Sequence, residues 1–230
     1  MKSQTELIVA LDVDTIEEGL ALVDELGDSV TWYKIGKQLF TRFGPAAVAS
    51  IKARGKKVFL DLKYHDIPNT VAQAVKSAAA IGADMTNVHA SGGPAMLQAA
   101  AKAAGGSNTL LIAVTVLTSM NQEELAAIGI TASPMEQVVR LAKLTQAAGV
   151  PGIVCSAQEI VPIRAACGPD FQLVVPGIRP AGADHGDQKR VMTPAEAAQA
   201  GANYIVVGRP ITAAADPRAA ALAILRELAG

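Results

Sequence analysis

The sequence is poor in features that define whole classes of protein. Aromatic residues make up only 3% of its 230 residues, and the formal net charge is −1. A chain with so few aromatic side chains lacks the stacking surfaces that bind single-stranded nucleic acid. A nearly neutral chain has no general attraction to polyanions or to anionic membranes. We therefore expect no nucleic acid and no membrane among its partners.

Cysteine and long apolar runs are scarce as well. Cys155 and Cys167 are too far apart for a CxxC site and too few for a disulfide framework, which predicts buried free thiols in a reducing compartment. No run approaches the ~18 apolar residues of a membrane span. The first apolar run, Leu7 to Leu11, is too short for the core of a signal peptide. These absences predict a soluble, cytoplasmic protein.

Short apolar segments alternate with longer alanine-rich segments along the chain. Half of the residues are hydrophobic, which is enough to bury a large core. Continuous apolar strands covered by helices are typical of a parallel sheet. Eight such units in 230 residues predict an α/β fold, a (β/α)8 TIM barrel that forms a single domain over residues 1–230. The expected strands are residues 7–13, 31–36, 57–63, 85–90, 109–117, 152–156, 171–177 and 203–208.

An open, doubly wound sheet is the alternative architecture. No GxGxxG motif follows the first expected strand, which disfavours a dinucleotide-binding sheet.

One long connection rich in glycine and proline, residues 176–194, follows the seventh strand. A loop of that length inside a compact domain is usually functional, so we expect it to act as a lid.

Polar residues stand at the carboxyl ends of most expected strands. In parallel barrels the active site forms at these ends, where side chains distant in sequence converge. An unpaired buried charge costs several kcal/mol, which disfavours a random scatter of charges there. The residues are Asp12, Lys34, Asp61, Lys63, His89, Thr118, Arg179 and Arg209.

Asp61 and Lys63 give the strongest of these signals. Strand side chains alternate with a period of two, so both face one side while Leu60 and Leu62 face the helix layer. We expect Asp61 and Lys63 to line the mouth of the barrel. A purely structural ion pair is the alternative.

The other charged residues have simpler explanations when each is taken singly. Asp12 could cap the following helix, and Lys34 could extend its ammonium to solvent. Arg179 and Arg209 each precede a proline and could be exposed turn residues. Only the joint pattern favours a site.

The histidines do not indicate a metal site. His65, His89 and His185 lack the spacing of metal ligands, and no carboxylate–histidine cluster accompanies them. We expect hydrogen-bonding or surface histidines and no metal.

The arginines suggest a phosphate. Arg179 and Arg209 follow the last two expected strands, where barrels frequently hold a phosphate group. A planar guanidinium can bond two phosphate oxygens, and Gly208 lets backbone N–H groups approach an anion closely. We expect a small phosphorylated substrate whose reacting part lies near the third strand.

Longer motifs resemble those of a known family. The order of Asp12, Lys34, "DLKYHDIPNT", "VTVLTSM", "PGIRP", "DQKRVMTP" and "VVGRPIT" resembles the orotidine 5′-phosphate decarboxylase family in its compact bacterial form, over essentially the whole chain. The D-x-K-x-x-D element alone is shared with a wider suprafamily, which includes 3-keto-gulonate-phosphate decarboxylase and hexulose-phosphate synthase. The "IPNT", "DQKRVMTP" and "GRPIT" elements make the resemblance more specific.

The resemblance implies decarboxylation of orotidine 5′-monophosphate to UMP without a cofactor. It implies that Lys63 stabilises and protonates the C6 carbanion, with Asp61, Asp66 and Lys34 completing the catalytic charge array. The further substrate-binding residues that it implies are Asp12 and Lys34 at the ribose, Thr118 at the pyrimidine, and Arg179, Gln188, Gly208 and Arg209 at the phosphate.

The resemblance also implies a homodimer with shared sites. Asp66, Ile67 and Thr70 are expected to enter the site of the neighbouring subunit. The small-molecule partners would be orotidine 5′-monophosphate and UMP.

Three other functions fit part of the pattern. A keto-gulonate-phosphate decarboxylase on the same barrel would use Mg²⁺, so sensitivity to EDTA distinguishes it. A Schiff-base aldolase would use Lys63 as its nucleophile, but aspartates on both sides keep that lysine protonated. A non-catalytic nucleotide-binding protein has no need of an Asp-Lys-Asp cluster.

Overall fold

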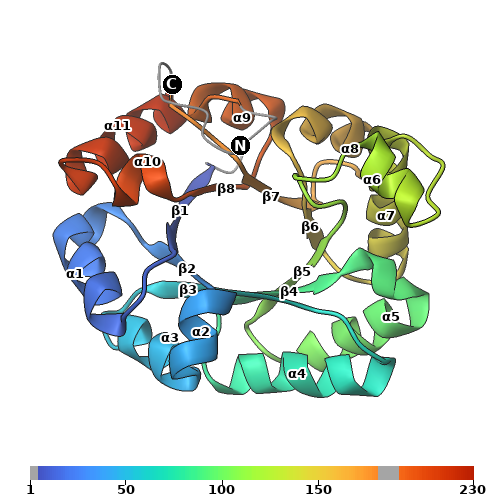
Figure 1. The fold of residues 1–230 in the computed structure, drawn as a ribbon, viewed down its shortest axis with the longest axis horizontal. Helices are drawn as coiled ribbons and strands as arrows, with labels where there is room; N and C mark the ends of the chain where they lie inside the picture. Colours follow the sequence, from blue (N-terminus) through green and yellow to red (C-terminus); the bar gives the residue numbers. More distant parts are fainter. Residues whose placement is uncertain (1–4, 181–191) are drawn as a thin grey trace.

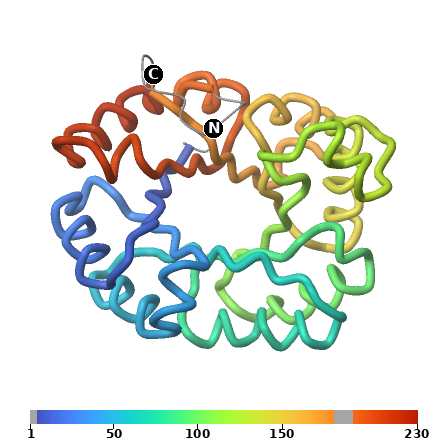
Figure 2. Tube along the Cα trace, viewed as in Figure 1, coloured from blue at the N-terminus to red at the C-terminus, as the bar shows by residue number. Residues whose placement is uncertain are grey.

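A computed structural model of the protein describes residues 5–180 and 192–230. The described strands form a closed parallel barrel in which neighbours follow chain order, so the (β/α)8 prediction is confirmed. β1 pairs with β8, which brings the first and last strands side by side (Figure 1 and Figure 2). The strands are β1 (Glu6–Leu11), β2 (Trp32–Gly36), β3 (Lys57–Tyr64), β4 (Met85–His89), β5 (Leu110–Val114), β6 (Gly152–Val154), β7 (Gln172–Pro176) and β8 (Tyr204–Val207).

The helices form a ring outside the barrel (Figure 1). Several begin at a residue whose side chain accepts a hydrogen bond from the first turn: Thr15, Asn121, Ser133, Thr193 and Asp216. Such caps satisfy backbone N–H groups that a helix start leaves unpaired. The helices are α1 (Ile16–Leu26), α2 (Lys37–Phe43), α3 (Pro45–Lys52), α4 (Pro68–Ala80), α5 (Gly93–Ala104), α6 (Gln122–Ala127), α7 (Pro134–Ala147), α8 (Ile160–Cys167), α9 (Pro194–Ala200), α10 (Arg209–Thr212) and α11 (Pro217–Ala229).

Two apolar layers hold the barrel together. The larger layer joins strands to helices, and it includes Leu60 with Leu62 packed against it, as the alternation of β3 predicts. The smaller layer, which we call the interior plug, contains strand residues alone. Its buried members are Ile8, Ala10, Trp32, Phe59, Met85, Ile112, Val174 and Val206.

The structure also bears on the predictions for the cysteines, for membrane spans and for the lid. Cys155 and Cys167 are buried and free, as predicted. Among the described residues, no helix has both the length and the apolar character that a membrane crossing requires. The predicted lid, residues 176–194, falls largely outside the described residues.

Candidate active site

The alternation of the strands places polar side chains directly above the interior plug. Two positions beyond plug residues on the first four strands, toward the carboxyl ends, the chain has Asp12, Lys34, Asp61 and Asn87. Because strand residues i and i+2 share a face, these side chains belong to the mouth of the barrel. The fold therefore brings together residues that lie far apart in sequence.

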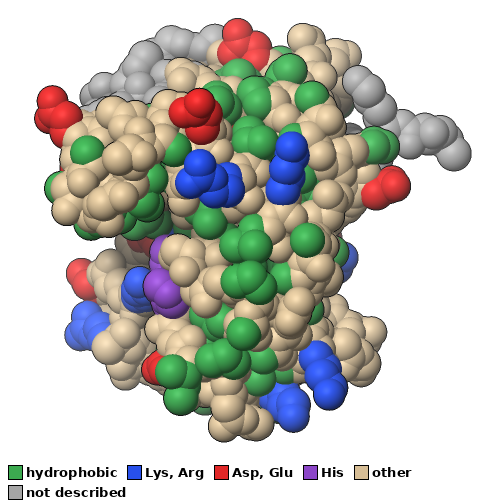
Figure 3. Space-filling view, turned by 90° about the vertical axis from the view of Figure 1, so that its right-hand side faces the viewer, with side chains coloured by type: hydrophobic (Ala, Val, Ile, Leu, Met, Phe, Trp, Pro, Cys, Tyr) green, Lys and Arg blue, Asp and Glu red, His purple; other side chains and the backbone are tan. Residues whose placement is uncertain are grey.

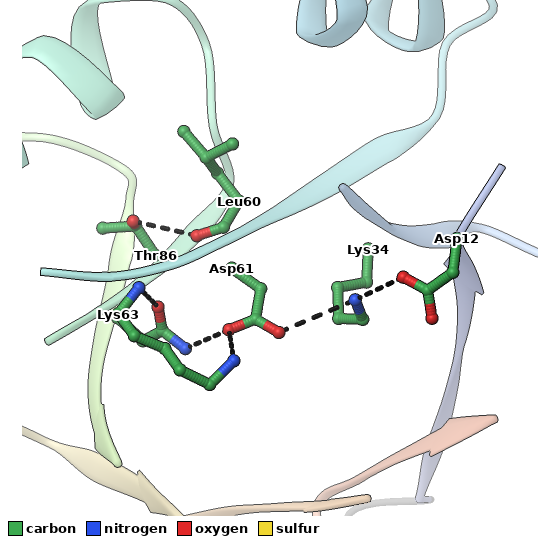
Figure 4. A network of polar contacts seen from close by, with 7 residues as sticks. Asp12, Lys34, Leu60, Asp61, Lys63 and Thr86 are labelled. Carbon is green, nitrogen blue, oxygen red and sulfur yellow. Dashed lines mark hydrogen bonds and ion pairs between the residues drawn. The ribbon is translucent and has the colours of Figure 1, made fainter. Parts of the chain in front are cut away.

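The charged members alternate in sign along a row (Figure 4). Lys34 Nζ lies 3.1 Å from Asp12 Oδ1 and 3.6 Å from Asp61 Oδ2. Lys63 Nζ donates to the other oxygen of Asp61, Oδ1, at 2.5 Å. The row thus runs Asp12, Lys34, Asp61, Lys63, and each ammonium touches a carboxylate.

Gly36 makes room for the Lys34 ammonium. A Cβ atom at Gly36 would lie 3.0 Å from Lys34 Nζ and 3.4 Å from Asp12 Oδ1. A methyl group at this position would therefore press against the polar atoms of the first ion pair. The glycine keeps Lys34 close to Asp12 and Asp61.

Asp61 is buried and remains ionised. Burial raises the pKa of its carboxyl group. The charges of Lys34 and Lys63 and the hydrogen bonds from Lys63 and Asn87 lower the pKa by more, so the net pKa falls below the ordinary value. A carboxylate in this state stabilises the ammonium groups on both of its sides.

Lys63 departs from regular strand geometry. Among the described residues other than glycine, it alone has a positive φ, +56°. The β3–β4 register passes from Leu60↔Thr86 to Tyr64↔Val88, so two extra residues bulge from β3. The period-two prediction placed Lys63 on the correct face, but a bulge rather than a regular strand positions it.

Asn87 was missed by the sequence reasoning. It is fully buried on β4, where its Nδ2 donates to Asp61 Oδ1 at 2.7 Å and its Oδ1 accepts from the Lys63 N–H at 2.8 Å. The signal was present, because Asn87 follows the apolar Met85 at strand spacing within an expected strand. The rule that selected Asp61 and Lys63 would have selected it too.

A cavity of about 190 Å³ lies beside the charged row. Its polar lining residues include Lys34, Asp61, Lys63 and Thr118, so these four predicted residues share one cavity. The Cys155 thiol also lines it, and burial raises the pKa of that thiol well above its ordinary value. The other apolar lining residues are Phe59, Val114, Val116, Leu117, Val154, Val174, Pro176 and Val206.

The predicted phosphate residues lie at the adjacent strands β7 and β8. Arg179 is buried and donates from Nη1 to the Ile178 carbonyl at 2.9 Å. Gly208 lies between β8 and α10, with Arg209 as the first residue of that helix. None of these three residues lines the cavity described above. The predicted Gln188 lies outside the described residues.

Asp66, Ile67 and Thr70 are exposed and do not reach the cavity in this subunit. Asp66 Oδ1 accepts the Ile67 N–H at 2.6 Å, and Asp66 forms no ion pair with a described residue. Ile67 is 67% exposed, which is unusual for a large apolar side chain. The prediction that these residues serve a neighbouring subunit stays a prediction.

Two histidines lie near the charged row. The rings of His65 and His89 have centroids 5.5 Å apart, and Figure 3 shows histidine side chains beside a hollow in the surface. Burial, followed by the nearby His65, Lys63 and Lys37, lowers the pKa of His89 to about 4, so its ring is neutral at pH 7. The described residues contain no group of three or more His, Cys, Asp or Glu side chains suited to a metal ion.

The arrangement defines a class of enzyme. A parallel (β/α)8 barrel with paired ammonium and carboxylate groups at its carboxyl end, beside a half-apolar cavity, is built to stabilise charge on a small substrate. The Orotidine 5′-phosphate decarboxylase / HUMPS family model matches residues 5–224, so the chain belongs to that family. The resemblance in the motifs is thereby confirmed.

Individual relatives agree with the family assignment. The chain is 56% identical over 216 residues to an orotidine 5′-phosphate decarboxylase of Pasteurella multocida, covering 93% of each chain. It is 54% identical over 236 residues to the protein of that name from Moorella thermoacetica, covering 99% of this chain and 94% of the relative. A crystal structure of orotidine 5′-phosphate decarboxylase from Lactobacillus acidophilus is 39% identical with a TM-score of 0.88, covering 98% of this chain and 100% of that one.

Proposed function

We propose that the protein converts orotidine 5′-monophosphate into UMP and CO2, with Lys63 as the group that acts on the reacting carbon. Family membership and relatives more than half identical in sequence support the reaction. The observation that carries the mechanism is the Lys63 side chain, which lines the cavity and is bonded to the ionised Asp61.

The chemistry requires a cation beside the substrate. Cleavage of the bond between C6 and the carboxylate leaves the electron pair on C6 of the pyrimidine, and CO2 departs. Lys63 Nζ then donates a proton to C6, which forms the C6–H bond of UMP, and the neutral amine regains a proton from water. A fixed positive charge that faces developing negative charge is usually the largest catalytic contribution.

Asp61 prepares Lys63 for this role. Its carboxylate favours the ammonium form and fixes the direction of the N–H groups through the 2.5 Å contact. A substrate carboxylate bound close to Asp61 would be repelled, and the repulsion would end as neutral CO2 forms. The apolar lining residues lower the local dielectric constant, which strengthens each of these charge interactions.

The rest of the nucleotide extends from the cavity toward β7 and β8. Asp12 and Lys34 hold the ribose in this proposal, and Thr118, which lines the cavity, meets the pyrimidine. Arg179, Gln188, Gly208 and Arg209 hold the phosphate. Because the phosphate is remote from C6, its binding energy can organise the site without touching the reaction.

We also propose that the enzyme is a homodimer. The exposed Asp66, Ile67 and Thr70 then complete the neighbouring site, where Asp66 adds a second carboxylate beside Lys63. The exposure of Ile67 supports this idea, since burial in an interface would remove it from water.

The chain as a whole is proposed to be one catalytic domain over residues 1–230 that works without a metal or cofactor. A cytoplasmic location fits its substrate, because a phosphorylated nucleotide is too highly charged to cross a bilayer unaided.

The loss of absorbance as orotidine 5′-monophosphate is consumed tests the proposal. The wild-type protein should turn over substrate at the same rate with and without EDTA, and Lys63→Ala should lose at least ~10⁴-fold in kcat. Lys102→Ala is the matched control, because Lys102 is an exposed lysine in the last turn of α5. Near-normal turnover by Lys63→Ala would refute the mechanism, and inhibition by EDTA would favour a metal-dependent sugar-phosphate decarboxylase.

A further inference from the structure

The bulge in β3 leaves the Lys63 backbone in an unfavourable state. A left-handed conformation is unfavourable for a non-glycine residue, so it persists only where surrounding contacts determine it. The shifted pairing between β3 and β4 also removes Lys63 from the regular ladder. Its N–H group therefore needs a different partner inside the protein.

The Asn87 side chain is that partner. Its Oδ1 accepts the Lys63 N–H at 2.8 Å, while its Nδ2 donates to Asp61 Oδ1 at 2.7 Å. Only one orientation of the amide satisfies both contacts, because the backbone N–H can only donate and the carboxylate can only accept.

We propose that Asn87 is a positioning residue, which aims the Lys63 ammonium by holding its backbone and the carboxylate of Asp61 with one amide group. The inference rests on the proposed role of Lys63. Asp61 Oδ1 receives both Asn87 Nδ2 and Lys63 Nζ, so movement of the amide would displace the carboxylate and the ammonium together.

Asparagine suits the position better than other polar residues. An aspartate would still accept the Lys63 N–H, but it would face Asp61 with a second negative charge and no hydrogen to donate. An alanine would leave both partners without their bonds in a fully buried place. The charged groups around Asp61 are Lys34 on β2 and Lys63 on β3, with His89 on β4 as a further titratable neighbour.

Two variants separate the bonds of Asn87. Asn87→Ala removes both, while Asn87→Asp keeps the acceptor for Lys63 and removes the donor to Asp61. Both should lose about 100-fold or more in kcat, the scale of a misplacement of about 1 Å at a reacting group. The Kd for UMP, measured by calorimetry, should change less than about fivefold, because positioning acts mainly on the transition state.

Thr86→Val is the matched control. Thr86 precedes Asn87, is equally buried, and also links β4 to β3 by a side-chain bond, from Oγ1 to the Leu60 carbonyl at 3.0 Å. Its loss should lower Tm by about 2–4 °C while kcat stays at the wild-type value. Melting of all variants, followed by the fluorescence of the single tryptophan, Trp32 in the interior plug, reports whether each is folded.

The pH dependence of kcat distinguishes lost positioning from a general loss of packing. Without the hydrogen bond from Asn87, the pKa of Asp61 should rise, so the acid limb of the kcat profile should move to higher pH in both Asn87 variants and stay fixed in Thr86→Val. Wild-type kcat, or an unshifted acid limb, in a folded Asn87→Ala protein would overturn the inference. Lys63→Ala assayed in parallel separates the two failures, since turnover by that variant would refute the role of Lys63 itself.

Discussion

Asp61→Asn isolates the effect of one buried charge. The new amide has nearly the shape of the carboxylate, and its oxygen can still accept from Asn87 and Lys63. Its NH2 group would then take the place of Oδ2, which lies 3.6 Å from Lys34 Nζ. The substitution thus converts an attraction into a contact between two donors and leaves Lys63 without its carboxylate.

The structure gives the scale of the loss. Two unit charges 3.6 Å apart interact by about 5 kcal/mol at an effective dielectric constant of 20, before desolvation is subtracted. Removing one partner of a buried pair costs about 3 kcal/mol at the lower end of the observed range. For a chain of this length that corresponds to a fall in Tm of about 6–12 °C at pH 7. Turnover should fall at least ~100-fold, because Lys63 loses the group that directs it.

Asp84→Asn provides the control for this experiment. Asp84 pairs with Lys52 at 2.7 Å, but both side chains are more exposed than those of Lys34 and Asp61. Because water screens the pair, the loss should be about 1 kcal/mol, with unchanged kcat. A Tm for Asp61→Asn equal to that of the control, or wild-type turnover, would refute the reasoning.

The pH dependence of stability supplies a second check on Asp61. Its folded pKa is lowered, so its stabilising contribution is complete above the unfolded value of about 4 and is lost as the pH falls toward the folded pKa. The difference in Tm between wild type and Asp61→Asn should therefore be constant from pH 7 to 5 and shrink below pH 4.

Three further outcomes are expected. Gly36→Ala should displace the Lys34 ammonium, whose Nζ would lie 3.0 Å from the new methyl group, and lower kcat/KM about 10-fold, with Tm reduced by only a few degrees. Arg209→Ala should reduce kcat/KM by about 2–4 kcal/mol in transition-state binding, and equal efficiency in wild type and variant would argue against a phosphate at this residue. Mixing inactive Asp66→Asn and Lys63→Ala subunits should restore activity, because each heterodimer regains one native site; no recovery on mixing would count against shared sites.

The sequence predicted the barrel and most of the charged row for one physical reason. Residues two apart on a strand face the same side, so the position of Phe59 in the plug fixes that of Asp61 at the mouth. The same alternation correctly sent Leu60 to the helix layer. The strand count followed from apolar segments, which were specific enough to identify all eight described strands.

The details around Lys63 could not be predicted in this way. Its left-handed backbone depends on the pairing of β3 with β4, which involves residues about 25 positions apart in sequence. That pairing leaves no pattern in the residues next to Lys63. Asn87, by contrast, could have been predicted, because it lies two residues after Met85 on an expected strand, as Asp61 lies two residues after Phe59. Asp66 lies beyond the strand, where the alternation no longer predicts the direction of a side chain.

The interior plug affects how the activity of such an enzyme can evolve. The apolar side chains of the plug close the barrel, and three of them, Phe59, Val174 and Val206, also line the cavity, whereas the charged groups stand on the next pleat of the strands. Mutations of the charged groups can therefore alter which substrate is transformed while the layer below continues to close the barrel. Old and new activities can share one inherited framework because those charged groups lie two residues along the strand from the layer that must be kept.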